Sequence, residues 1–314
     1  MVEQAGMSAE KLLQDGLTRG DAVIASARPV LRYLLSNEDS DLFTDEVIAR
    51  IRGMVFDMAD RLLFAVAEAA GISDRDDFLA KHLDDLVTSL SGDEPLLGHA
   101  HALALEGRMA EALQERSDVD AVLPPLVQEL AASDDETVAG LAMSYLAAQA
   151  RFMQHQRRME LPLGELPGDL FHKALLILQS HDLAEPEVMD AAIASLRKGF
   201  DEAHGRLGLV TRLVTCMGGK LRRALRVEQA GLAIFATALA MGSDQDRDLA
   251  ILALNGRLPA RLALSLRAAG LKAERIRAQF AYLQPMAMLP DGLDGLSGKR
   301  AAAILAEAEL GTAA

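Results

Sequence analysis

Apolar residues recur along this chain with the period of an α-helix. The clearest stretch runs from Asp45 to Ala70, with Thr44 as the expected cap and Gly71 as the stop. Its apolar positions, spaced three, four or seven residues apart, are Val47, Ile48, Ile51, Met54, Val55, Met58, Leu62, Leu63 and Val66. Further helices are predicted over residues 73–90, 133–158, 169–181, 186–204, 207–216, 221–241, 244–254, 259–269, 272–283 and 299–309. No long alternating stretch favours a strand, so the predicted fold is all-α: a helical bundle or an irregular α-solenoid of stacked antiparallel hairpins.

One segment interrupts the helical pattern more strongly than any other. Residues 160–168 hold two prolines and two glycines within nine positions. The sequence therefore predicts an N-terminal helical domain over 1–160 and a C-terminal helical-repeat-like domain over 169–290. Residues 291–314 are expected to form a tail with one short helix.

Composition narrows the classes of function. The net charge of -14 disfavours both a nucleic-acid partner and an anionic membrane surface. The single cysteine, Cys216, excludes an intramolecular disulfide and a cysteine zinc cage, and its apolar neighbours predict that it is buried. Residues 1–14 show no signal peptide, and the longest apolar run, Ala230–Gly242, is too short to span a bilayer. We therefore expect a cytoplasmic protein.

Short segments in the second half carry a resemblance to a known family. They are Glu165–His172, Ala233–Gly242, Ala250–Leu254 and Leu262–Leu271. Their order is similar to an alphaproteobacterial all-helical family known only as a domain of unknown function. The resemblance covers about a third of the chain and implies an all-helical fold, with no active site to transfer.

The dipeptide His181-Asp182 raises an alternative hypothesis of catalysis. In helical metal-dependent phosphohydrolases of the HD class, such a pair binds a metal with another histidine and a distant aspartate. His155 or His172 and Asp201 could take those roles, and the metal would activate water. However, Leu183 and Ala184 replace the Gly and Lys that often follow the pair, and a histidine also suits a helix C-terminus. We therefore expect neither a metal centre nor a cofactor.

One basic segment stands out in this acidic chain. Residues 197–226 hold eight basic and two acidic residues, a net charge of +6. Such a segment either pairs with acidic helices of the same chain or docks an acidic partner. The candidate partner-binding residues are Lys220, Arg222, Arg223 and Arg226. Docking requires their side chains to be exposed and not paired with acidic residues of the same chain. The sequence thus predicts a non-catalytic protein-interaction or regulatory protein whose partner is another protein with an acidic surface; a homo-oligomer is left open.

Overall fold

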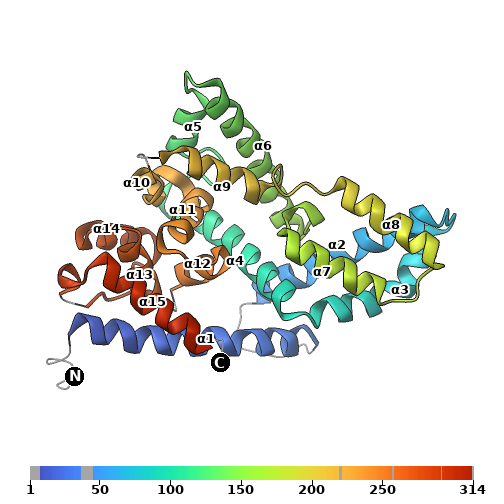
Figure 1. The fold of residues 1–314 in the computed structure, drawn as a ribbon, viewed down its shortest axis with the longest axis horizontal. Helices are drawn as coiled ribbons and strands as arrows, with labels where there is room; N and C mark the ends of the chain where they lie inside the picture. Colours follow the sequence, from blue (N-terminus) through green and yellow to red (C-terminus); the bar gives the residue numbers. More distant parts are fainter. Residues whose placement is uncertain (1–7, 37–44, 219–220, 257, 291, 313–314) are drawn as a thin grey trace. The chain divides into compact units, whose positions relative to one another are not determined.

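In a computed structural model, α-helices make up the chain (Figure 1). The structure describes residues 8–36, 45–218, 221–256, 258–290 and 292–312, and no strand occurs within these ranges. The helices are α1 (Ala9–Ser36), α2 (Asp45–Ala69), α3 (Arg75–Ser91), α4 (Glu94–Ser117), α5 (Pro125–Ala131), α6 (Glu136–Arg158), α7 (Gly168–Gln179), α8 (Pro186–Gly199), α9 (Arg206–Cys216), α10 (Leu221–Ala224), α11 (Val227–Ser243), α12 (Arg247–Leu254), α13 (Pro259–Ala268), α14 (Ala273–Leu283) and α15 (Gly298–Thr312). The described residues also form the short 3-10 turns η2 (Leu163–Glu165) and η4 (Leu293–Gly295). The all-α prediction is confirmed.

The chain divides into two compact units, each built from separate stretches of sequence. Unit 1 takes its residues from Met1–Ala27, Leu105–Leu146 and Val210–Ala314, and unit 2 from Arg28–Ala104 and Ala147–Leu209. The boundary predicted at residues 160–168 therefore lies inside unit 2. The prolines and glycines there do end a helix. However, α7 and α8, which follow this segment, belong to the same unit as α2 and α3, and local composition does not encode such long-range packing.

Unit 1 is organised around α11, which packs against α5, α10, α12, α13 and α14. Almost every residue of α11 is buried, which is why its sequence is apolar all round. The predicted single helix over 221–241 is in fact α10 and α11, and Gly231 kinks α11 with a φ of 70°. A Cβ at Gly231 would lie 2.9 Å from Cγ of Pro124, so this position needs glycine for both conformation and space.

Unit 2 is organised around α2, which packs against α3 and α8, with α7 against α3 (Figure 1). Every apolar residue predicted to form the inner stripe of α2 is buried. The helix stops before Gly71, which adopts a φ of 66°, as predicted. The cap of α3 is Asp74, whose carboxylate accepts the backbone N–H of Asp77, so this helix begins slightly later than the predicted range 73–90.

Two further details bear on the sequence predictions. Thr44, the predicted cap of α2, lies outside the described residues. Cys216 is exposed rather than buried, because it ends α9 beside a chain turn and not within the core. Within the described ranges, no helix is both long and apolar enough to cross a membrane.

Candidate functional site

An open pocket of about 590 Å³ lies within unit 2 and is the strongest candidate site. Its walls come from α2, from the segment after α6 that contains η2, and from the carboxyl end of α8. The lining residues are Asp57, Asp60, Arg61, Phe64, Ala65, Glu68, Pro162, Leu163, Gly164, Phe171, Ser195, Leu196, Gly199 and Phe200. Charged groups thus come from α2 alone, and the other walls are mainly apolar.

The α2 wall is a second face of that helix, beside its buried stripe. Each lining residue of α2 has another lining residue three or four positions away, which places them all on one side of the α-helix. None of them is fully buried, whereas the neighbouring positions Met58, Leu62 and Leu63 are. One face of α2 therefore builds the core and the adjoining face lines the pocket.

Close approach of the segment after α6 to α2 is possible because Gly53 has no side chain. A Cβ at Gly53 would lie 2.5 Å from Cβ of Met159. One turn further along α2, the Asp57 carboxylate accepts the backbone N–H of Leu161 at 2.9 Å. The Nε–H of Arg61 donates to the same carboxylate oxygen at 2.7 Å. Asp57 thus holds Leu161 and orients Arg61, and residues 162–164 follow directly as the pocket edge.

Asp60 is a carboxylate whose ionised form the fold disfavours. Partial burial raises its pKa above the ordinary value for an aspartate, the negative charge of Asp57 raises it further, and Arg61 lowers it. Among the described residues, none donates a hydrogen bond to the Asp60 carboxylate or forms an ion pair with it. A positively charged ligand would supply the direct partner that Arg61, which is bonded to Asp57, does not provide.

Aromatic rings and a helix end form the rest of the pocket. Phe171 and Phe200 stack with their ring centroids 4.0 Å apart and their planes inclined by 4°. Phe64 is 43% exposed, and the guanidinium of Arg75 lies 4.8 Å from its ring centroid. The carboxyl end of α8, where Leu196 and Gly199 line the pocket, has Arg197 and Lys198 in its last turn, and their charges offset the negative end of the helix dipole. The acidic groups and the aromatic rings favour a cation with apolar parts.

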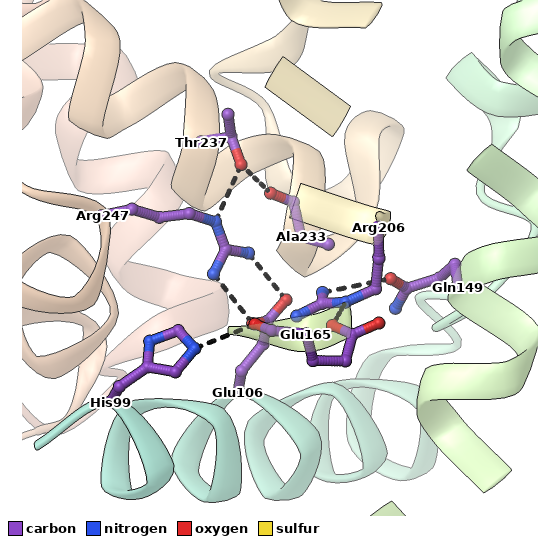
Figure 2. A network of polar contacts seen from close by, with 8 residues as sticks. All are labelled: His99, Glu106, Gln149, Glu165, Arg206, Ala233, Thr237 and Arg247. Carbon is purple, nitrogen blue, oxygen red and sulfur yellow. Dashed lines mark hydrogen bonds and ion pairs between the residues drawn. The ribbon is translucent and has the colours of Figure 1, made fainter. Parts of the chain in front are cut away.

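Beneath this region, Arg206 anchors η2 within unit 2 (Figure 2). Its fully buried guanidinium donates through Nε to Glu165 Oε2 at 2.8 Å and lies 3.6 Å from the centroid of the Phe152 ring. The Glu165 carbonyl accepts from Nε2 of His99 at 3.1 Å, which places the proton on Nε2. These contacts hold η2 by both its side chain and its backbone.

Unit 1 has a comparable buried ion pair (Figure 2). Arg247 donates to both carboxylate oxygens of Glu106 at 2.8 and 3.0 Å, and through Nε to the Thr237 hydroxyl at 3.0 Å. The Thr237 hydroxyl in turn donates to the carbonyl of Ala233, within α11. Each of the three guanidinium nitrogens of Arg247 thus donates a hydrogen bond inside unit 1. This cluster therefore ties helices together and offers no open site.

The residues of the phosphohydrolase alternative do not converge. His181 hydrogen-bonds through Nε2 to the Ser89 hydroxyl at 3.0 Å, while Asp182 and His172 are exposed. Across the described residues, no three His, Cys, Asp or Glu side chains are placed to hold one metal ion.

The other two residues of that alternative are engaged locally. His155 pairs with Glu160 at 2.6 Å, and this hydrogen bond lowers the pKa of Glu160. Asp201 pairs with His204 at 2.8 Å, which likewise lowers the pKa of Asp201. These contacts are formed between near neighbours in sequence and leave the alternative without support from geometry.

The basic segment is partly neutralised by acids of its own chain. Arg223 donates both terminal nitrogens to the Glu129 carboxylate at 2.6 and 2.7 Å, and Arg226 pairs with Glu228 at 2.8 Å. The expectation that Arg223 and Arg226 have no intramolecular acidic partner is therefore wrong: the turn into α10 brings Arg223 against α5. Arg222 is exposed as predicted, and Lys220 lies outside the described residues.

The pocket was not predicted from the sequence, although part of its signal is visible there. Asp57, Asp60, Arg61, Phe64 and Glu68 recur at helical spacing on the outer side of a predicted helix. A solvent-facing helix surface shows the same pattern, and only the long-range contact with Leu161 and α8 turns it into a pocket. Comparison of the chain with protein-family models, with curated proteins and with solved structures gave no match.

Proposed function

We propose that this chain is a non-catalytic binding and regulatory protein, and that the pocket of unit 2 binds a positively charged organic ligand. The observation that carries the proposal is Asp60: a partly buried carboxylate with no hydrogen-bond or ion-pair partner among the described residues, in an open and largely apolar pocket. Holding a carboxylate in this state has a cost in stability, which a cationic ligand would offset.

The surroundings of Asp60 support a cation over an anion. Glu68 adds a second negative charge on the same wall, and the one basic lining residue, Arg61, is already held by Asp57. The exposed ring of Phe64 and the Phe171–Phe200 stack supply apolar surface for the rest of the ligand. An anionic ligand would meet two carboxylates that have no hydrogen-bond or ion-pair partner among the described residues.

A matched pair of small ligands tests this directly. Butylamine and butanol have similar shapes, but only the amine is charged at neutral pH. Titration of the full chain, followed by NMR or calorimetry, is expected to show butylamine binding more tightly than butanol. Asp60→Asn should remove that preference, whereas Asp84→Asn, which alters an exposed aspartate of α3 outside the pocket, should keep it. Equal binding of the two ligands by the unaltered protein would contradict the proposal.

The protein-partner prediction is retained for Arg222. Of the four residues Lys220, Arg222, Arg223 and Arg226, it is the one described residue that is both exposed and without an acidic partner among the described residues. We propose a cytoplasmic role in which an acidic surface of another protein contacts this position. Arg222→Glu should weaken that contact, and the loss should shrink as ionic strength rises, because salt screens exposed charges.

A further inference from the structure

The pocket presents two carboxylates that have no hydrogen-bond or ion-pair partner among the described residues, not one. Besides Asp60, Glu68 is exposed on the same wall, and no described residue forms a hydrogen bond or ion pair with its side chain. Two positive charges lie nearby. Arg61 is paired with Asp57, and Arg75 faces the ring of Phe64, so neither neutralises the second carboxylate.

The spacing of these acids sets the length of a ligand that reaches both. Asp60 and Glu68 are eight residues apart on α2, which corresponds to about 12 Å along the helix axis. A hydrogen bond from an ammonium group spans only about 3 Å, so one charge cannot contact both carboxylates. Phe64 lies midway, four residues from each acid, so the part of the ligand that joins the charges crosses an aromatic ring.

From this arrangement of acid, ring and acid, we infer that the ligand is a linear aliphatic polyamine. Its terminal ammonium groups pair with Asp60 and Glu68, and its methylene groups cross Phe64 and face Leu196 and Phe200. The inference rests on the proposed function, because it assigns a ligand class to the same cation pocket.

Two observations favour a free polyamine over a basic protein segment. The cavity of about 590 Å³ lies in the size range of small-molecule sites. The charged wall is the interior of a long helix, whose backbone N–H and C=O groups are bonded to one another. An extended peptide would find no backbone partners along this wall, whereas a polyamine needs only carboxylates and apolar surface.

The experiment compares spermidine with butylamine on the full chain by calorimetry, at neutral pH and fixed ionic strength. Spermidine is expected to bind roughly twofold to fivefold more tightly, because it engages Glu68 as a second, exposed carboxylate. Glu68→Gln should lower the affinity for spermidine roughly twofold to fivefold, as for an exposed ion pair, and leave butylamine unchanged. Asp84→Asn serves as the matched control and should alter neither.

Different failures point to different steps of the argument. If butylamine and spermidine bind equally and Asp60→Asn weakens both, the cation pocket stands and the polyamine assignment is overturned. The same holds if a peptide with lysines four residues apart binds more tightly than spermidine. If neither amine binds, the proposed function itself fails.

Discussion

The carboxylate of Asp57 accepts the backbone N–H of Leu161, a residue 104 positions further along the chain, at 2.9 Å. This contact fixes the edge of the pocket, because Pro162, Leu163 and Gly164 follow at once and line it. Gly53 allows the approach one turn earlier on α2, where a Cβ would meet Met159. The position of this loop thus depends on both the Asp57 carboxylate and the absence of a side chain at Gly53.

Replacing Asp57 by alanine is expected to destabilise the protein by about 1–3 kcal/mol, since the Leu161 amide and Arg61 lose a charged acceptor together. Urea unfolding followed by circular dichroism measures this loss. Arg61→Gln is the control, because it removes the ion pair and keeps the bond to Leu161; it should cost much less. A similar loss from both changes would show that the ion pair, and not the backbone contact, holds the loop.

For Asp60 the opposite effect is expected: removing its charge should not destabilise the folded state at neutral pH. Burial and the charge of Asp57 raise its pKa in the folded chain, so the folded state holds this proton more tightly than the unfolded state. Stability therefore falls as pH rises from the ordinary aspartate pKa through the raised value. Asp60→Asn should leave Tm at neutral pH unchanged or higher, with any gain vanishing at pH values below the ordinary pKa. A lower Tm at neutral pH would show that the ionised carboxylate stabilises the fold.

The same raised pKa sets how ligand binding depends on pH. A cation pairs with the ionised form of Asp60, so affinity should weaken as pH falls through the pKa of this residue. Asp57, Arg61 and Glu68 are the other charged groups on the pocket wall, and the η2 and α8 walls contribute none. Titration of butylamine at several pH values should show this loss in the unaltered protein and a flatter profile in Asp60→Asn. Identical profiles would remove Asp60 from the site.

Local patterns predicted the helices well because each inner stripe must be buried. The apolar positions of α2 from Val47 to Val66 are all in the core, and Gly71 stops the helix where expected. The pocket depends instead on contacts between distant residues, such as Asp57 with Leu161. Such pairs leave no trace in local spacing, so the outer face of α2 was indistinguishable from a solvated one.

Domain organisation was hidden for the same reason. Unit 2 gathers Arg28–Ala104 and Ala147–Leu209, so residues 160–168 join helices of one unit. The helix-breaking prolines there correctly predicted an interruption, and η2 fills it. Arg206 and Glu165, 41 residues apart, hold this segment within the unit through a buried pair that charge patterning alone could not assign.

Replacing Arg206 by lysine is expected to lower the stability of the folded protein. Its planar guanidinium donates to Glu165 and stacks over Phe152, whereas a lysine ammonium cannot do both. Removal of one partner from a buried pair costs about 3–5 kcal/mol when the other is left without compensation. Arg206→Lys should lose a large part of this, measured by urea unfolding, and Arg206→Met should lose more. Near-normal stability of Arg206→Lys would mean that charge alone is sufficient there.

Arg222 and Arg223 are neighbours with different expected roles, and reversing each charge separates them. Arg223→Glu breaks a bidentate pair and opposes Glu129, while Arg222→Glu alters an exposed residue. The first should therefore be the more destabilising, although only modestly, since exposed pairs contribute about 0.2–1 kcal/mol. Adding Glu129→Arg to Arg223→Glu should restore stability, because the pair is rebuilt with its charges exchanged. If Arg222→Glu destabilises the fold as much as Arg223→Glu, the pairing with Glu129 is not what distinguishes them. If it keeps the fold and leaves the affinity for an acidic partner unchanged, the basic segment serves structure alone.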